Sequence, residues 1–121
     1  MASDQIVYVI DDDDGARRSL EFLLCCAGVR ARGFVSADAF LKDSPPLEGA
    51  CVVTDVRMPG TSGIELAETL KTRGAAISVI MISGHADAAL AIKAKKAGVT
   101  DFIEKPFDKE IMLSAIRRAL T

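Results

Sequence analysis

The side chains best suited to chemistry in this sequence share one feature: each comes directly after a short apolar segment. They are Asp11 and Asp12 after residues 6–10, Asp55 after 50–54, Ser83 after 77–82 and Lys105 after 101–104. Two carboxylates roughly 4 Å apart repel by about 4 kcal/mol at an effective dielectric of about 20. A bound cation removes that repulsion, and carboxylate oxygens suit Mg²⁺ or Mn²⁺ rather than Zn²⁺.

A lysine and a hydroxyl group beside such carboxylates would serve a phosphoryl group. Lys105 offers a positive charge and Ser83 a hydrogen-bond donor for phosphoryl oxygens. With the acidic residues they predict a Mg²⁺-assisted phosphoryl-transfer site in which one aspartate is the nucleophile. A single aspartate after a strand is as often a helix N-cap, which is the role we expect for Asp14, so the prediction depends on the combination at four strand ends.

The segments that must position these side chains alternate between two kinds. Residues 6–10 form a short, β-branched apolar run typical of a buried parallel strand. A helical pattern follows, with apolar positions on one face of 16–27 and Gly28 as its stop. The same pair recurs four times. Strands are predicted over 6–10, 30–34, 50–54, 77–82 and 101–104, and helices over 16–27, 36–42, 64–72, 87–97 and from Asp108 onward.

Five such units predict the α/β class, with a five-stranded parallel sheet covered by helices on both faces. In the common strand order 2-1-3-4-5, the first and third strands lie side by side. Ligands of these sheets bind beyond the carboxyl ends of the strands, where the strand order reverses. Asp12 and Asp55 would meet there, although they are 43 positions apart in the sequence.

The composition restricts the possible function classes. The chain has 121 residues, of which 50% are hydrophobic, and 15 basic against 17 acidic side chains give a formal net charge of -2. We expect one folded domain over residues 1–121 rather than a disordered chain. The balanced charge argues against a surface that grips nucleic acid, and no apolar run approaches the roughly 20 residues of a membrane span. Because the start does not resemble a signal peptide, we expect a cytoplasmic location and no membrane contact.

The three cysteines predict neither zinc binding nor disulfide chemistry. None belongs to a CxxC pair or to a Cys/His cluster with zinc spacing. Cys25 and Cys26 lie inside an apolar run, so we expect both to be small core residues in a reducing compartment.

Four stretches of the chain, each weak evidence alone, become specific through their order and spacing. They are Val-Ile-Asp-Asp-Asp (9–13), Thr-Asp-Val-Arg-Met-Pro-Gly (54–60) with Gly63, Ile-Ser-Gly (82–84) and Asp-Phe-Ile-Glu-Lys-Pro-Phe (101–107). Across essentially its whole length, the chain resembles the receiver domain of two-component response regulators. Together with Gly-His-Ala-Asp (84–87), the second and fourth stretches look most like the FixJ-like subgroup.

The resemblance implies a phosphoacceptor and a metal site. Asp55 would accept a phosphoryl group from the phosphohistidine of a sensor histidine kinase. Asp11 and Asp12 would hold Mg²⁺ (or Mn²⁺), with Asp12 and Asp55 as the direct carboxylate ligands and Arg57 giving a backbone carbonyl. Arg57 and His85 stand at positions that vary in the family and flank the phosphate, which makes them candidates for tuning hydrolysis.

The resemblance also implies a switch. Ser83 and Lys105 would bind the phosphoryl oxygens, and Ser83 would move together with the aromatic residue Phe102. Ser83 stands where many family members have threonine. The tight turn after the fifth strand, where X-Pro bonds can be cis, and the family pattern together predict a cis Lys105–Pro106 bond.

The implied partners follow from the same family. Phosphorylation would change the face formed by the fourth helix, fifth strand and fifth helix and promote a homodimer. DNA would be contacted only through a C-terminal output domain that is not in this chain, and we expect the chain to be the receiver part of a longer regulator. Such a domain is not an enzyme in the ordinary sense, since it catalyses only its own phosphorylation and dephosphorylation.

Two other functions remain as alternatives. A small Mg²⁺-dependent phosphatase with an aspartate nucleophile usually has a second acid two residues later, where this chain has Arg57. A phosphate-independent interaction domain would not need the complete set of Asp55, Ser83, Lys105 and the acidic cluster. A nucleotide-binding P-loop is excluded because the chain has no G-x-x-x-x-G-K-[ST] motif.

Overall fold

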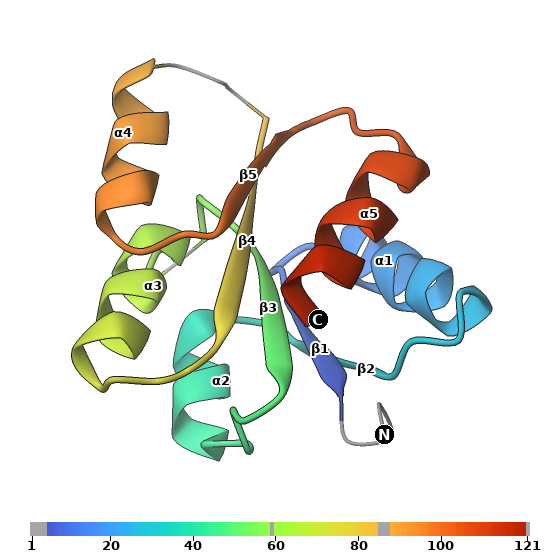
Figure 1. Ribbon diagram of the computed structural model, residues 1–121, viewed down its shortest axis with the longest axis horizontal. Helices are drawn as coiled ribbons and strands as arrows, with labels where there is room; N and C mark the ends of the chain where they lie inside the picture. Colours follow the sequence, from blue (N-terminus) through green and yellow to red (C-terminus); the bar gives the residue numbers. More distant parts are fainter. Residues whose placement is uncertain (1–4, 59, 85–87, 121) are drawn as a thin grey trace.

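The computed structural model describes residues 5–58, 60–84 and 88–120, which form one parallel sheet and the helices around it (Figure 1). The strands are β1 (Ile6–Ile10), β2 (Ala31–Phe34), β3 (Ala50–Asp55), β4 (Ser78–Ser83) and β5 (Asp101–Glu104). Their order in the sheet is β2-β1-β3-β4-β5, and all four neighbouring pairs are parallel. The predicted fold class and strand order are confirmed.

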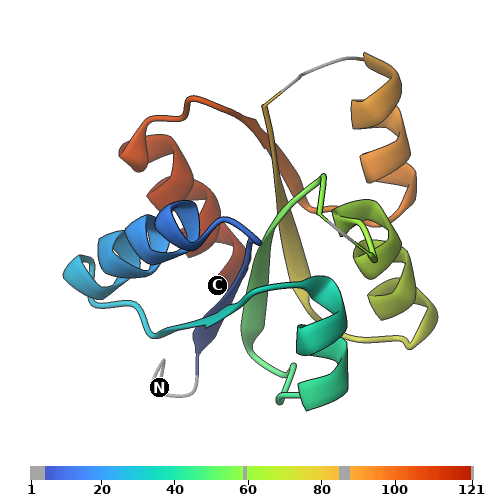
Figure 2. The same ribbon diagram turned by 180° about the vertical axis from the view of Figure 1, so that it is seen from behind.

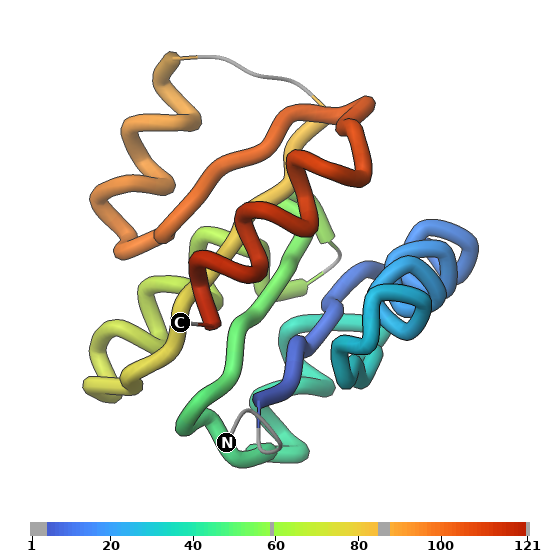
Figure 3. The backbone as a smooth tube through the Cα atoms, turned by 45° about the vertical axis from the view of Figure 1, so that its right-hand side comes forward, coloured from blue at the N-terminus to red at the C-terminus, as the bar shows by residue number. Residues whose placement is uncertain are grey.

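A helix follows each strand, as the alternating pattern predicted. The helices are α1 (Asp14–Cys26), α2 (Ala37–Asp43), α3 (Gly63–Thr72), α4 (Ala88–Lys96) and α5 (Lys109–Leu120). Figures 1 and 3 show α1 and α5 together on one side of the sheet and α2, α3 and α4 on the other. Figure 2 shows the same arrangement from behind.

Each face of the sheet has its own hydrophobic core, because side chains alternate along the strands. In β3, Cys51 and Val53 pack with α1 and α5, whereas Val52 packs with α2, α3 and α4. β3 is the central strand, with β1 on one side and β4 on the other. Its residues up to Thr54 are all buried, so the strand is a rigid support for the residue at its end.

Polar side chains cap the starts of the helices, and glycines follow the ends of α1 and α4, much as predicted. Ser36 caps α2 through its hydroxyl, and Asp108 accepts a hydrogen bond from the N–H of Glu110 at the start of α5. One prediction was wrong by a residue: Asp14 is the first residue of α1, and the N-cap is Asp13. Asp13 caps because its backbone is still extended, which leaves its carboxylate free to turn back on the first helical turn.

The segment boundaries differ slightly from those predicted. Asp55 and Ser83 are the last residues of β3 and β4 rather than the first residues beyond them. Asp87, the predicted start of the fourth helix, lies outside the described residues. The peptide bond between Lys105 and Pro106 is cis, as predicted.

The expectation that Cys25 and Cys26 belong to the core is wrong. Both are exposed at the end of α1, whereas Cys51 is fully buried in β3. The apolar run misled the prediction because α1 buries only the face that contains Leu20 and Leu24.

Among the described residues, no helix has the length and apolar character needed to cross a membrane.

Candidate functional site

Strand pairing places the predicted site residues at one edge of the sheet. Ile10 of β1 pairs with Thr54 of β3, so Asp11 and Asp55 follow at the same level. Asp55 pairs with Ile82 of β4, one residue before Ser83. The site is therefore assembled by the register of strands that are far apart in the sequence.

Lys105 reaches back to this edge from the turn after β5. Its Nζ lies 2.8 Å from Oδ2 of Asp55, and its backbone N–H donates to the carbonyl of Ser83 over 2.7 Å. Burial lowers the pKa of the Lys105 ammonium, but the hydrogen bond and charge of Asp55, with the charge of Asp11, raise it by more. The net shift is upward, so Lys105 carries its positive charge beside Asp55 at neutral pH.

Asp11 is the most buried of the acidic residues here, with a relative exposure of 7%. Burial raises its pKa, the N–H of Asp13 that donates to Oδ1 over 2.9 Å lowers it, and the negative charges of Asp55 and Asp12 raise it again. Arg17 donates from Nη1 to the backbone carbonyl of Asp11 over 3.0 Å and so holds this end of β1. A carboxylate whose pKa is raised chiefly by burial, and further by neighbouring carboxylates, is a site where a cation would relieve repulsion.

The donor set fits a hard cation, although its side chains are not drawn together into a metal cage. Asp12 is exposed, and Oδ2 of Asp55 is occupied by Lys105. Over the described parts of the chain, no group of three or more His, Cys, Asp or Glu side chains is close enough to hold a metal ion. The oxygens present are carboxylate and carbonyl, the ligands that Mg²⁺ prefers over softer metals.

The loop between β3 and α3 carries Arg57 against Asp55. The Arg57 backbone N–H donates to Oδ1 of Asp55 over 3.1 Å. The loop closes where Gly63 N–H donates to the Val56 carbonyl over 3.0 Å. A Cβ on Gly63 would overlap the carbonyl oxygen of Asp55, so α3 can start here only with glycine.

Ser83 and Phe102 lie together on the other face of the sheet from Asp55. Ser83 is 4% exposed and follows the alternation of Val79 and Met81 in β4, which pack on the α2–α4 side. Phe102 is half-buried, pairs with Met81 in register and packs against the same cluster. Asp55, by contrast, continues the alternation of the residues that pack toward α1 and α5. His85 lies outside the described residues.

Two residues near the site were missed by sequence reasoning. Arg17 holds the carbonyl of Asp11, and Asp38 of α2 accepts hydrogen bonds from Thr61 in the β3–α3 loop. In the sequence, each is a polar residue in a helix, which is typical of a solvated surface. No local signal marks them, because their partners are reached only through the tertiary fold.

Comparisons with known proteins agree on one family. The model of the response regulator receiver domain matches residues 7–117. The transcriptional regulatory protein FixJ of Azorhizobium caulinodans is 51% identical over 114 residues, and the match covers 94% of this chain and 54% of that protein. The response regulator protein TmoT of Ectopseudomonas mendocina is 44% identical over 117 residues, covering 97% of this chain and 53% of TmoT.

Solved structures give the same picture. The crystal structure of FixJ-N has a TM-score of 0.90 and 42% identity, covering 98% of this chain and 94% of that one. Full-length FixJ from B. japonicum has a TM-score of 0.87 and 44% identity, covering 95% of this chain and 57% of that structure. The chain therefore spans about half the length of the curated relatives it matches.

Proposed function

The chain belongs to the response regulator receiver domain family, close to FixJ, and from this premise we propose that residues 1–121 take a phosphoryl group from a sensor histidine kinase onto Asp55. Members of this family are not conventional enzymes; they typically use Mg²⁺, and a histidine kinase is the partner that such a regulator implies. The observation that carries the proposal is the Lys105–Asp55 pair of 2.8 Å beside the buried Asp11.

The transfer step converts one phosphorylated side chain into another. A carboxylate oxygen of Asp55 attacks the phosphorus of the kinase's phosphohistidine, and a P–O bond forms as the P–N bond breaks. The imidazole nitrogen keeps the electron pair and takes up a proton from solvent. The product is an acyl phosphate on Asp55, at the end of β3. The buried residues of this strand would hold the acyl phosphate in place.

Lys105 would stabilise the charge that gathers on the transferred group. It already lies beside Oδ2 of Asp55 and stays protonated there, so a small movement brings it onto a phosphoryl oxygen. Ser83, at the end of the neighbouring strand, would donate its hydroxyl to a second phosphoryl oxygen. Together they replace the water that would otherwise solvate the group.

Asp11, Asp12 and Asp55, with the backbone carbonyl of Arg57, would hold Mg²⁺ or Mn²⁺. When bound, the ion neutralises negative charge on the carboxylates and the phosphoryl oxygens. The support for this set is the burial of Asp11 at the same sheet edge as Asp55; burial raises its pKa, and the charges of Asp55 and Asp12 add smaller increases. Asp12 and Asp55 would bind directly, and Asp11 would orient the site from its buried position.

Phosphorylation would then switch the surface formed by α4, β5 and α5, which we name the output face. A phosphoryl group adds nearly two negative charges and three acceptor oxygens at Asp55. Ser83 would move toward it, and Phe102 would turn into the space that Ser83 vacates. Moving a population from about 1:99 to 99:1 needs roughly 5.5 kcal/mol. A few charge-assisted hydrogen bonds of about 1.5–3 kcal/mol each supply that amount.

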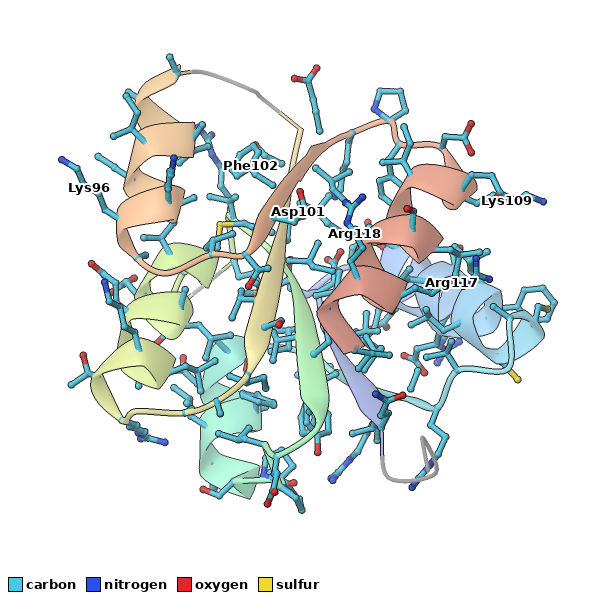
Figure 4. The ribbon with its side chains drawn as sticks, in the orientation of Figure 1. Lys96, Asp101, Phe102, Lys109, Arg117 and Arg118 are labelled. Atoms are coloured by element: carbon cyan, nitrogen blue, oxygen red, sulfur yellow. The ribbon has the colours of Figure 1, made fainter. Side chains whose placement is uncertain are left out.

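The output face combines basic side chains, an acid–base pair and an exposed apolar residue (Figure 4). The last turn of α4 is basic, with Lys93, Lys95 and Lys96. On β5, the half-buried Asp101 lies 2.9 Å from the exposed Arg118 of α5. Ile92 on α4 is 55% exposed and offers an apolar centre. An exposed apolar side chain rimmed by polar ones suits a two-fold contact between copies, so the phosphorylated form would be a homodimer.

The longer protein would be a transcription regulator. The printed name of the Azorhizobium relative is a transcriptional regulatory protein, and the match covers 54% of it. We propose that a C-terminal output domain outside this chain contacts DNA and that dimerisation of the receivers brings two such domains together. The cytoplasm is the proposed location, and no membrane contact is part of the mechanism.

The decisive experiment measures phosphate uptake from acetyl phosphate with Mg²⁺ present. The wild type should take up one phosphoryl group per chain, and Asp55→Asn should fold normally and take up none. Release of phosphate from a generic phosphomonoester should stay at background. Stoichiometric labelling of Asp55→Asn would remove Asp55 from the role, and steady turnover of the phosphomonoester would favour a phosphatase instead.

A further inference from the structure

The β3–α3 loop is held from outside by a side chain of another element. Asp38, in the first turn of α2, accepts a hydrogen bond from the Thr61 hydroxyl over 2.6 Å through Oδ1. Its second oxygen, Oδ2, accepts from the backbone N–H of Thr61 over 3.4 Å. Both carboxylate oxygens thus engage one loop residue that lies 23 positions away in the sequence.

The backbone of Asp38 is held in place because α2 packs against the core through the residues beside it. Its neighbours Ala37 and Phe40 are 0% and 1% exposed. The Phe40 ring lies 5.3 Å from the rings of both Tyr8 and Phe34. The carboxylate therefore projects from a helix anchored to β1 and β2, the strands on one side of β3.

Gly60 lets the loop approach this carboxylate. A Cβ at position 60 would lie 2.5 Å from Oδ2 of Asp38, and the backbone has a φ of +79°. The left-handed conformation favours glycine, and a side chain at this position would push the Asp38 carboxylate away from the loop. The close contact between α2 and the loop thus depends on Gly60.

The same loop carries Arg57, whose N–H donates to Asp55 and whose carbonyl is the proposed metal ligand. In this loop, Arg57 is exposed between the buried residues Val56 and Met58. The far end of the loop is fixed by the capping box in which Ser62 and Glu65 exchange hydrogen bonds. Asp38 acts between these anchors, on the outer part of the loop that the core does not reach.

We propose that Asp38 is a positioning residue for the metal site, which it serves by fixing the β3–α3 loop and, through it, the Arg57 carbonyl. The inference depends on the proposed function of the site, because it assigns Arg57 a metal to bind. Asp38 touches neither the metal nor the phosphoryl group; its effect passes through Thr61 and the loop backbone.

The test compares Mg²⁺ affinity by calorimetry in three single variants of the chain. Asp38→Ala should weaken Mg²⁺ binding by about tenfold, the lower end of what outer partners of metal sites contribute. Thr61→Val keeps the backbone N–H and should weaken binding less. Asp43→Ala is the matched control, because Asp43 is an acid on the same helix that pairs with Arg32 at 3.1 Å, away from the loop.

A kinetic measurement separates positioning from general loss of structure. The rate of phosphorylation by acetyl phosphate is measured against Mg²⁺ concentration. Asp38→Ala should need more Mg²⁺ for half the maximal rate and still reach the wild-type rate at saturation. The double variant Asp38→Ala/Thr61→Val should bind Mg²⁺ no more weakly than Asp38→Ala alone, because both substitutions break the same link.

The outcomes distinguish this inference from the proposed function. If the wild type binds Mg²⁺ and Asp38→Ala binds it equally well, Asp38 has no positioning role. An equal loss in Asp43→Ala would mean that α2 acts only through general stability. If Asp38→Ala does not fold, unchanged affinity in Thr61→Val overturns the inference. A wild type that binds no Mg²⁺ would overturn the metal site and this inference together.

Discussion

Asp11 and Asp14 lie close together in the chain, yet their pKa values shift in opposite directions. Burial and the charges of Asp55 and Asp12 raise the pKa of Asp11, against the hydrogen bond from Asp13. The hydrogen bond and charge of Arg17 lower the pKa of Asp14, which is fully exposed. The difference follows first from burial, which is the largest cause for Asp11 and not for Asp14, and then from what each carboxylate faces: other carboxylates for Asp11 and a guanidinium for Asp14.

We expect Asp11→Asn to raise the free energy of unfolding of the metal-free protein at pH 7. A carboxyl whose pKa is raised on folding contributes stability that is present below its unfolded pKa and lost as the pH rises through its folded pKa. The amide resembles the protonated acid, so the gain should disappear near pH 4. Urea unfolding of both proteins across this pH range measures it.

Asp14→Asn is the control with the opposite sign. A lowered pKa gives stability that is present above the unfolded pKa and lost as the pH falls, so this substitution should reduce stability slightly at neutral pH. If Asp11→Asn also reduced stability at pH 7, the carboxylate of Asp11 would not be under repulsion. Saturating Mg²⁺ should reverse the advantage of Asp11→Asn, since the metal would prefer the carboxylate.

At the level of single residues, the sequence reveals those that follow strands and hides those that act across elements. Asp11, Asp55 and Lys105 were predictable because parallel strands bring their ends to one edge. Asp38 and Arg17 were not, because the sequence marks only that they belong to helices. Their partners depend on how α1 and α2 pack, which no local pattern encodes.

At the level of elements, the start of α3 is set by Gly63. In Gly63→Ala, the new Cβ would overlap the backbone carbonyl of Asp55, which cannot turn aside as a flexible side chain could. We expect a loss of about 1–3 kcal/mol of stability and slower phosphorylation as β3 and α3 separate. Chemical unfolding and acetyl phosphate labelling measure the two effects.

Gly84→Ala is the matched control for Gly63→Ala. Gly84 also follows a strand that ends at the site, but among the described residues a Cβ there would meet nothing within 4 Å. Its stability should stay within about 0.5 kcal/mol of the wild type. Similar losses in both variants would show that overlap with Asp55 is not the cause.

The helix α4 is attached to the molecule more weakly than its neighbours. Ala94 is the one buried residue of α4, whereas α5 buries Met112, Leu113, Ala115 and Ile116. Few buried contacts leave a helix free to open locally. We expect the amide hydrogens of α4 to exchange with solvent faster than those of α1, α3 or α5 in the unphosphorylated protein, as NMR exchange would measure. Equal protection of α4 and α5 would contradict this.

The element types were predictable because each has a strong local pattern. The five apolar strands and the glycines after α1 and α4 fix the alternation. The ends were less certain because they depend on tertiary contacts. Asp55 and Ser83 belong to strands because the neighbouring strands continue to pair with them. The exposed Cys25 and Cys26 were misassigned since an apolar run does not show where the packed face of a helix ends.

At the scale of the whole molecule, the acceptor and the proposed switch lie on opposite faces of one sheet. Asp55 continues the face that packs toward α1 and α5, while Ser83 and Phe102 belong to the face of α2, α3 and α4. A phosphoryl group at the sheet edge can be reached from both sides. In the proposed switch, Ser83 is the residue through which phosphorylation of Asp55 would change the output face.

We expect beryllofluoride, a phosphoryl mimic, to convert the wild-type chain from monomer to dimer and to leave Ser83→Ala largely monomeric. The variant keeps Asp55 and Lys105, so it should still take up phosphate, although more slowly. Sedimentation velocity measures the dimer and acetyl phosphate labelling the uptake. Full dimerisation of Ser83→Ala would exclude Ser83 as the coupling residue, and a wild type that stays monomeric would exclude the dimer itself.

The exposed pair of cysteines on α1 has a consequence for redox conditions. Burial raises the pKa of the Cys51 thiol to about 12, which protects it from oxidation, but Cys25 and Cys26 face solvent. In air, two chains could therefore be covalently joined through α1, on the other side of the sheet from α4. Such a species would have the mass of a signalling dimer while leaving Asp55 unmodified. A reducing agent, or replacement of both residues by serine, should abolish this covalent form and leave the proposed phosphorylation-dependent dimer intact.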